Sequence, residues 1–465
     1  MSPINNKYLI STNPAKGYEE VGRVLISTEE EVIDAVKKAH EALPAWRALS
    51  IKNRREYFKK FLDLYKDRVK ELAELQTREM GKPITESLSE CNGRAATLEL
   101  NVENSIKALE PQILDVYDTH QTELHFEPRG VVATIAPWNY PTSQFLIAIG
   151  QPLLAGNTIV FKHSEECPLT SQLLARLMKE AGFPEGVFTC LYGDGAVGEM
   201  LLNQNIDLIM FTGSSRVGEM IYKKAAEKFI PVVLEMGGSS PAIVFDDVDL
   251  DEICLSVFNE RFKNNGQICC ALKRLIVHES IQDQVVEILT KNINNQVIGD
   301  PLDEKTTIGS LSAKRQLETL EVQVEDARSN GATIVTGGKR AEGLDGAYYM
   351  PTLITNTTPD MKVVTEEVFG PVLPIITFKT EEEAIQIAND TPYGLSAFVY
   401  SKDLERASRV AHALEAGQVS INGCSYFSTN APFGGYKKSG IGRTKGDIGF
   451  IQVTQQKVIS RPIKK

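Results

Sequence analysis

Residues 131–162 read VVATIAPWNYPTSQFLIAIGQPLLAGNTIVFK, and this stretch decides the fold class. Two short apolar runs, 131–135 and 158–161, have the length and β-branched content of buried strands. The apolar stretch 143–154 between them is long enough for a helix. Because neighbouring parallel strands need a long connection, this strand–helix–strand order predicts a parallel pair joined by a crossover helix.

The same order of elements continues on the carboxyl side of this stretch. Two further pairs follow, a strand at 187–191 with a helix at 196–203 and a strand at 207–211 with a helix at 214–228. Short buried strands alternating with amphipathic helices indicate a parallel, doubly wound sheet. Such a sheet binds its ligand at the carboxyl ends of its strands, so we expect a functional site at that edge.

Helices are predicted on the amino side of the sheet. Residues 27–31 read STEEE, which is typical of a capping box, and apolar residues follow at helical spacing. Two longer helical stretches are predicted at 54–79, ended by the MGKP sequence, and at 86–109. Strands at 113–117 and 123–126 then predict a hairpin that reaches out of the first domain as an arm.

A second α/β series begins after residue 235, at a glycine-rich junction before residue 241. Its predicted strands lie at 241–245, 274–278, 333–336 and 373–378, and its predicted helices at 250–262, 281–292, 313–329 and 381–389. A glycine-rich loop and a strand at 450–460 are expected to end the chain. The sequence therefore predicts an α/β protein with two sheet domains and a small β arm.

The composition narrows the class of protein. A chain of 465 residues is too long for one hydrophobic core, and its formal net charge of −11 argues against a nucleic-acid or anionic-membrane partner. The N-terminus lacks a signal-peptide pattern and no apolar run approaches the roughly 18 residues of a membrane helix, so we expect a cytoplasmic protein. The cysteines predict neither a disulfide framework nor a metal site: Cys91, Cys167, Cys190, Cys254, Cys269, Cys270 and Cys424.

Two adjacent thiols lie in the polar, glycine-containing run FKNNGQICCAL at residues 262–272. Gly266 lets the backbone approach a ligand closely, and a cysteine of lowered pKa is the most nucleophilic side chain near neutral pH. Cys269 and Cys270 are therefore candidate nucleophiles, although a single cysteine is more often a small buried hydrophobe. The pair also leaves open whether the two thiols act independently or as a redox pair.

Polar side chains follow three of the predicted strands. Asn139 follows residues 131–135, where its amide could donate to a developing oxyanion or could simply form a turn. Glu235 closes an apolar strand, where burial would raise its pKa toward the range of a general base, unless it is a surface carboxylate. Gly213 and Ser214 open a helix whose N-terminus could hold a pyrophosphate, although the GxGxxG signature is absent.

Over essentially its whole length, the sequence resembles the aldehyde dehydrogenase superfamily. The motifs that carry the resemblance occur in the family's order: APWNYP at 136–141, LEMGG at 234–238, NGQICC at 265–270, EEVFGP at 366–371 and PFGGYKKSGIGR at 432–443. Each motif alone reads as a loop, whereas their joint occurrence is specific to the family.

The resemblance implies a domain organisation and an activity. Residues 1–110 and 129–235 would form a Rossmann-like NAD(P)-binding domain, residues 236–445 a catalytic α/β domain, and residues 111–128 with 446–465 an arm for oligomerisation. The activity would be oxidation of an aldehyde to a carboxylic acid with NAD, or with NADP as the other possible cofactor. A homo-dimer or homo-tetramer with a small-molecule aldehyde substrate is implied, without a nucleic-acid or membrane partner.

The resemblance also implies roles for single residues. Cys269 matches the family nucleophile, Glu235 the base and Asn139 the oxyanion donor, so that a thiohemiacetal on Cys269 would become a thioester and water activated by Glu235 would release the acid. The matched cofactor contacts are Lys162 and Glu165 at the adenosine ribose, Gly213 and Ser214 at the pyrophosphate, and Glu367 and Phe369 at the nicotinamide ribose, and Trp138 is a further cofactor-binding residue. Because the carboxylate of Glu165 would repel a ribose 2′-phosphate, NAD is expected to be preferred.

Three positions depart from the common family pattern, namely His163, Ser239 and Thr444, and Thr444 stands where many members have a second Glu. The chain is most similar to the succinate-semialdehyde dehydrogenase branch. That branch commonly has arginines where this chain has Ile147 and Lys263, and an uncharged Ile147 cannot pair with a carboxylate.

Three alternatives to the semialdehyde assignment stay open. The enzyme could oxidise an uncharged aliphatic aldehyde, or it could be a CoA-acylating dehydrogenase. Members of the CoA-acylating type lack a Glu at position 235. The third alternative is a non-catalytic relative that keeps the fold, although Cys269, Glu235 and Asn139 are all present.

Overall fold

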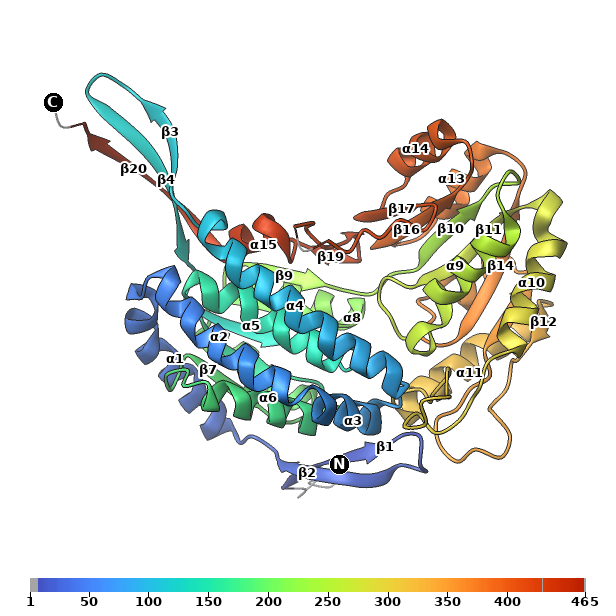
Figure 1. The fold of residues 1–465 in the computed structure, drawn as a ribbon, viewed down its shortest axis with the longest axis horizontal. Coiled ribbons are helices and arrows are strands. Elements are labelled where there is room, and N and C mark those ends of the chain that lie inside the picture. The colour runs from blue at the N-terminus through green and yellow to red at the C-terminus, as the bar shows by residue number, and fades with distance from the viewer. Residues whose placement is uncertain (1–6, 429, 464–465) are drawn as a thin grey trace.

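The computed structural model describes residues 7–428 and 430–463 and contains two large sheets and a projecting arm (Figure 1). The first predicted domain begins at residue 1 and the predicted arm ends at residue 465, but residues 1–6 and 464–465 lie outside this description. The last parallel strand of the first sheet ends at Glu235 and the first strand of the second sheet begins at Ser240. The α/β class predicted from residues 131–162 is confirmed.

The first sheet has six strands in the order β19-β9-β8-β5-β6-β7. Five of them are parallel to their neighbours, and β19 runs antiparallel to β9. The strands are β5 (Val131–Ile135), β6 (Thr158–Lys162), β7 (Phe188–Leu191), β8 (Leu208–Thr212), β9 (Val232–Glu235) and β19 (Gly440–Ile441). Because β19 comes from the end of the chain, a segment expected in the second domain completes the first sheet.

Helices follow and precede these strands in the predicted order. They are α1 (Glu29–Ala48), α2 (Ile51–Asp67), α3 (Val69–Met80), α4 (Ile84–Ala108), α5 (Pro141–Ala155), α6 (Pro168–Glu180), α7 (Gly195–Asn203) and α8 (Ser215–Glu227). Thr28 and Glu31 form the predicted capping box at the start of α1, in which each side chain accepts the other's backbone N–H. The helix α5, which is almost entirely buried, begins at Pro141 in the first turn, where proline has no helical hydrogen bond to lose.

Two sequence-based element predictions need correction. The single helix predicted at 54–79 is two helices, because Arg68 leaves the helical region with φ −112° and ψ 7°. The strand predicted at 450–460 begins only at Thr454, because Phe450 is a buried residue of the short helix α15 (Gly446–Gln452), which packs on the core of the first sheet. In both places a helix end falls where the sequence has no strong local signal.

The second sheet has seven strands in the order β12-β13-β14-β11-β10-β16-β17, and only β12 and β13 pair antiparallel. They are β10 (Ser240–Val244), β11 (Leu272–His278), β12 (Thr333–Thr336), β13 (Thr352–Thr355), β14 (Val372–Phe378), β16 (Ser396–Tyr400) and β17 (Gln418–Ile421). The helices of this part are α9 (Leu250–Phe262), α10 (Gln282–Asn294), α11 (Lys314–Ser329), α12 (Lys362–Thr365), α13 (Glu381–Asn389) and α14 (Leu404–Ala413).

Three antiparallel strands form the arm, which projects away from both large sheets at the upper left of Figure 1. They are β3 (Gln112–Val116), β4 (His120–Pro128) and β20 (Thr454–Pro462), with β4 in the middle. A short hairpin of β1 (Tyr8–Asn13) and β2 (Glu19–Leu25) and the two-residue pair β15 (Tyr393–Gly394) and β18 (Tyr436–Lys437) complete the strands. Within residues 7–428 and 430–463, no helix has the length and hydropathy that crossing a membrane requires.

Candidate active site

Two cavities meet at Cys269, one of about 260 Å³ and one of about 480 Å³. The residues that line both are Asn139, Gln144, Thr212, Glu235, Met236 and Cys269. Asn139 follows β5, Glu235 ends β9 and Cys269 comes just before β11. The fold therefore brings the three predicted catalytic residues together, at the carboxyl edge of the first sheet where a doubly wound sheet binds ligands.

A tight turn in front of Cys269 presents its thiol. Asn264, Asn265 and Gly266 have φ angles of 50°, 53° and 69°, in the left-handed region. For the two asparagines this backbone costs roughly 1–3 kcal/mol each, which the surrounding structure must offset. A Cβ on Gly266 would lie 2.3 Å from the carbonyl oxygen of Gly370, so only glycine fits there. The sequence NNG is therefore a structural requirement for the position of Cys269.

The amide of Asn139 is fixed beside this turn. Its Nδ2 donates to the carbonyl oxygen of Gln267 at 2.9 Å, and Nδ2 of Asn264 donates to the backbone carbonyl of Asn139, also at 2.9 Å. Only one of the two Nδ2 hydrogens is used, and in the part of the chain that the structure describes the N–H of Cys269 donates to no acceptor. Two donors next to the thiol are thus available to an oxyanion.

Glu235 is buried in a way that suits a base. Its side chain is 5% exposed, Oε1 lies 3.5 Å from the hydroxyl of Thr444, and Oε2 has no hydrogen-bond partner among the described residues. Burial, and next the negative charge that Cys269 would carry as a thiolate, raise the pKa of Glu235 well above its usual range. The carboxyl group is therefore ready to hold or release a proton between the two cavities.

The two thiols interact with each other. A hydrogen bond with Cys270, together with burial, raises the pKa of Cys269 well above that of a free thiol. The resting nucleophile is therefore protonated, and its activation requires a proton acceptor nearby. The charged form of Cys269 and that of Glu235 each disfavour the other, which is the behaviour of two groups that share one proton.

Lys273 is a site residue that the motifs did not assign. It lies fully buried at the start of β11, where its ammonium donates to the carbonyl oxygens of Gly238 at 2.7 Å and Cys269 at 3.1 Å. It also forms an ion pair with Glu367, whose carboxylate accepts the N–H of Gly238. Lys273 thus fixes the backbone of the nucleophile. A lysine inside a strand of apolar residues was the sequence signal for it.

The smaller cavity has the lining of a dinucleotide site. Five of the predicted cofactor residues line it, namely Trp138, Gly213, Ser214, Glu367 and Phe369. The rings of Trp138 and Phe369 meet edge to face with centroids 5.6 Å apart, and a Cβ on Gly213 would lie 2.5 Å from the ring of Phe211. A flat aromatic wall, a glycine turn and the N-terminus of the thirteen-residue α8 fit the nicotinamide and pyrophosphate parts of the predicted cofactor.

The other two predicted cofactor residues, Lys162 and Glu165, are not among the residues that line this cavity. They form an ion pair of 3.5 Å at the carboxyl end of β6. Arg315, which the sequence motifs did not indicate, reaches across from α11 to Glu165 at 3.0 Å and to Glu166 at 2.9 Å. Two cations therefore contact the carboxylate that is expected to bind the adenosine ribose.

The larger cavity lies on the opposite side of Cys269 and is lined by α4, α5, α9 and the segment after β19. Its walls include the apolar side chains of Ile147, Phe427 and Phe433. Its acidic and basic lining residues, apart from Glu235 and the two thiols, are Glu86, Glu90, Glu260, Arg94, Lys263 and Lys445. An elongated substrate entering here would place its aldehyde end at Cys269 and its far end among these charges.

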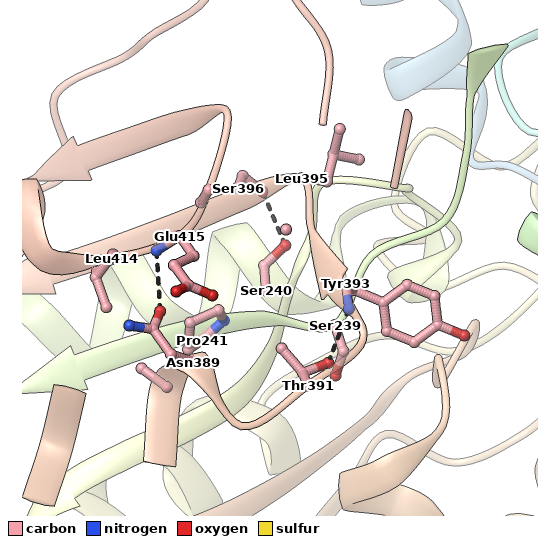
Figure 2. A pocket seen from close by; sticks show the side chains of 14 residues that line it. Ser239, Ser240, Pro241, Asn389, Thr391, Tyr393, Leu395, Ser396, Leu414 and Glu415 are labelled. Atoms are coloured by element: carbon pink, nitrogen blue, oxygen red, sulfur yellow. Dashed lines mark hydrogen bonds between the residues drawn. The ribbon is translucent and has the colours of Figure 1, made fainter. Parts of the chain in front are cut away.

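A separate small cavity at the start of β10 is not part of this site (Figure 2). Its volume is about 10 Å³, hardly enough for one water molecule. It lies next to Ser239. Beside it, the hydroxyl groups of Ser240 and Ser396 form a hydrogen bond of 2.8 Å, and the N–H of Glu415 donates to Oδ1 of Asn389 at 2.9 Å. The departure from the family pattern at Ser239 therefore falls outside both large cavities.

Comparison with known proteins agrees with this geometry. The family model described as "Aldehyde dehydrogenase family" matches residues 3–459. The chain is 40% identical to aminoaldehyde dehydrogenase 1, peroxisomal, of Pisum sativum, covering 99% of this chain and 93% of that protein. It is 37% identical to succinate-semialdehyde dehydrogenase [NADP(+)] of Deinococcus radiodurans, covering 97% and 94%. The solved NAD+ complex of aldehyde dehydrogenase from Bacillus cereus superposes with a TM-score of 0.95 at 35% identity, over 100% of this chain and 95% of that one.

Proposed function

The chain belongs to the aldehyde dehydrogenase family and oxidises aldehydes with NAD(P), and from that premise we propose that Cys269, Glu235 and Asn139 carry out the reaction. The observation that carries the proposal is the position of Glu235. It is buried, one of its oxygens has no hydrogen-bond partner in the part of the chain that the structure describes, and it lines both cavities together with Cys269. A carboxyl group in that position serves the thiol and a hydrolytic water alike.

The chain's own groups act in the following order. Cys269 gives up its proton to Glu235, and its sulfur adds to the aldehyde carbon to form a thiohemiacetal. Asn139 and the N–H of Cys269 donate to the oxyanion that develops on the former carbonyl oxygen. A nicotinamide cofactor held in the smaller cavity by Trp138, Gly213, Ser214, Glu367 and Phe369 would supply the acceptor for the hydride that leaves this carbon. A thioester on Cys269 remains. Glu235 first releases the proton of the thiol to solvent and then takes a proton from the water that attacks the thioester, and the sulfur of Cys269 leaves and is protonated again as the acid is released.

The proposed substrate is succinate semialdehyde, as in the branch that the sequence resembles. An uncharged aliphatic aldehyde is the second candidate, since Ile147 offers no charge to a carboxylate. Relatives of similar identity also have names that specify other aldehydes. The presence of Glu235 argues against transfer of the acyl group to CoA, because hydrolysis needs a base that thiol transfer does not.

The proposal is tested by steady-state oxidation of butanal, 4-oxobutanoate (succinate semialdehyde) and 4-aminobutanal, each with NAD and with NADP, and each with and without CoA. We expect reduced cofactor and free acid in equal amounts, at a rate that CoA leaves unchanged. Formation of acyl-CoA in place of the acid, or no reduction of cofactor with any of the aldehydes, would overturn the proposal.

We also propose the assembly and the location that the family resemblance implies. The exposed apolar side chains Ile113, Val116 and Val458 lie on the arm, which supports its assignment to oligomerisation in a homo-dimer or homo-tetramer. The proposed domains are 1–110 with 129–235 and 236–445. The break between β9 and β10 supports the boundary at residue 235, whereas β19 within the second range pairs with the first sheet. The seven cysteines are all free thiols, which supports a reducing cytoplasm.

Glu165→Ser is expected to move cofactor preference from NAD toward NADP by about tenfold or more in kcat/KM, measured for both cofactors at one saturating aldehyde. In the wild type, a ribose 2′-phosphate would meet the carboxylate of Glu165 as a like charge. Without that carboxylate, Lys162 and the Nη1 of Arg315, whose Nη2 still contacts Glu166, would be available to pair with the phosphate.

Glu166→Ser is the matched control, because Glu166 contacts the same Arg315 without contacting Lys162. Its shift in cofactor preference is expected to be the smaller of the two. A wild-type enzyme that prefers NADP, or equal shifts in the two variants, would show that Glu165 does not set the choice.

A further inference from the structure

Two cations in the larger cavity have no acidic partner. Within residues 7–428 and 430–463, neither Arg94 nor Lys445 forms an ion pair, although both line the cavity that contains Cys269. Other buried cations of this chain contact either a carboxylate, as Lys82 and Lys273 do, or several backbone carbonyl oxygens, as Arg261 does. Unpaired charges that converge on a cavity are costly for the free protein and become favourable when a ligand neutralises them.

Lys445 is held in the cavity by a strained backbone. Its φ angle is 62° at ψ 171°, a conformation that residues other than glycine rarely adopt. The side chain of Gln151 on α5 holds this backbone in place, because its Oε1 accepts the N–H of Lys445 at 3.0 Å and its Nε2 donates to the carbonyl oxygen of Gly446 at 2.8 Å. Strain that the surroundings maintain in this way points to a use for the residue.

The ammonium of Lys445 lies over two aromatic rings, 4.6 Å from the centroid of Phe433 and 5.1 Å from that of Phe427. These contacts favour a cation without neutralising it. Burial lowers the pKa of Lys445 to about 8, which leaves the ammonium predominantly charged at neutral pH. The same pKa is raised by Cys270, Glu235 and Cys269, so the ammonium lies within electrostatic reach of the reacting groups.

Arg94 faces the same cavity from α4. Its Nε donates to the hydroxyl of Ser143 at 2.9 Å, and this is the one hydrogen bond that its side chain makes with the described residues. The two terminal nitrogens of the guanidinium, which present their N–H groups in a planar fork, are thus left for another acceptor. A guanidinium in this state matches the geometry of a carboxylate. Arg94 and Lys445 repel each other, as the lowered pKa of Lys445 reflects.

The acidic residues of the cavity are engaged elsewhere. Glu90 forms an ion pair with Lys82 and accepts the N–H of Ser143. Glu86 accepts the N–H of Asn264, and its burial raises its pKa to about 7, so that it is partly protonated near neutral pH. Lys263 is the cation that acts electrostatically on both Glu86 and Glu260. Lys263, which also forms no ion pair among the described residues, thus acts on two carboxyl groups. Lys445 acts only on Glu235, the carboxyl group that the reaction itself uses, and Arg94 contacts no carboxylate in this part of the chain.

We infer that Arg94 and Lys445 form the anion subsite of the substrate cavity, so that the enzyme acts on aldehydes that carry a carboxylate at the far end of a short aliphatic chain. This inference rests on the proposed function, since it names the substrate class of the same site. Ile147, Phe427 and Phe433 supply apolar contacts for the methylene groups between the two ends. The subsite replaces the branch's missing arginine at position 147 with cations from α4 and from the segment after β19.

The test compares 4-oxobutanoate with butanal, two aldehydes of equal chain length that differ in the terminal carboxylate. The wild type should use 4-oxobutanoate with a kcat/KM about 10- to 100-fold higher than that for butanal. Arg94→Gln and Lys445→Gln should each remove most of this preference, mainly by raising KM for 4-oxobutanoate. Because butanal carries no group for the subsite, its kcat/KM should fall much less than that of 4-oxobutanoate in both variants, and the remaining turnover also shows that the variants are folded.

Lys263→Gln is the informative comparison within the cavity, and Lys70→Gln on the exposed surface is the neutral control. A larger loss of preference in Lys263→Gln than in the other two cavity variants would move the subsite to Lys263. An equal loss with both aldehydes in Lys445→Gln would assign that residue to the chemistry instead. A wild type that oxidises butanal without preferring 4-oxobutanoate would overturn the subsite alone. A wild type that oxidises neither aldehyde would contradict the proposed function itself.

Discussion

Cys269→Ala is expected to lower kcat/KM for every aldehyde by about 10⁴-fold or more, because the reaction loses the atom that bonds to substrate. Binding of cofactor should persist, since Trp138, Ser214 and Phe369 line the smaller cavity independently of the thiol. Steady-state kinetics measure the loss, and fluorescence titration with the reduced cofactor measures the binding. The two results together separate a chemical defect from a misfolded protein.

Cys270→Ala is the matched control for this variant. Cys270 is buried beside the nucleophile and contacts it through a hydrogen bond. Because that hydrogen bond raises the pKa of Cys269, its removal should lower this pKa and leave turnover within about tenfold of the wild type. Substantial activity in Cys269→Ala together with loss of activity in Cys270→Ala would show that Cys270, and not Cys269, is the nucleophile.

Glu235→Gln is expected to stall after the first half of the reaction. A glutamine cannot take a proton from water, so hydrolysis of the thioester should slow by about 10²- to 10⁴-fold. Rapid-mixing experiments should show a burst of reduced cofactor, of up to one equivalent per active site, followed by little steady-state turnover. The burst should itself be slower than in the wild type, because Glu235 also accepts the proton of the Cys269 thiol. Mass spectrometry should find the acyl group on Cys269. A burst at the wild-type rate would indicate that a group other than Glu235 accepts the proton of the thiol.

The same residue sets a pH dependence. Because the pKa of Glu235 is raised, the carboxyl group is protonated at low pH and becomes a base only as the pH rises through that elevated pKa. The steady-state rate of the wild type should therefore increase over this interval, and Glu235→Gln should lose the increase. Full turnover with an unchanged pH profile in the variant would remove Glu235 from the mechanism.

Much of this architecture could be predicted because local patterns and family motifs agree. The βαβ stretch at 131–162 specified a parallel sheet through strand length and connection length alone, and the capping box at Thr28 marked the start of α1. Helix ends at Arg68 and Gln452 were missed because neither glycine nor proline marks them. At such positions tertiary packing decides where the backbone turns, and the neighbouring residues contain no signal that would predict the turn.

The residues of the candidate site also fall into those that the sequence predicted and those that it did not. Asn139, Glu235 and Cys269 each follow a recognisable motif, so their convergence was predictable from the resemblance. Arg94 and Arg315 were not, because each acts from a helix whose charged residues look like an ordinary solvated face. Their significance depends on which other charges lie nearby, and that information exists only once α4 and α11 are packed against the sheets.

The pairing of β19 with β9 has a consequence for synthesis on the ribosome. The strand that ends in Glu235 is made about two hundred residues before Gly440 and Ile441, which cover its outer edge. Until those residues emerge, the nascent first domain has an unpaired strand edge of the kind that promotes association between chains. Release of the C-terminal segment therefore both closes this edge and encloses the base, so a newly made chain gains protection against aggregation and its activity at the same moment.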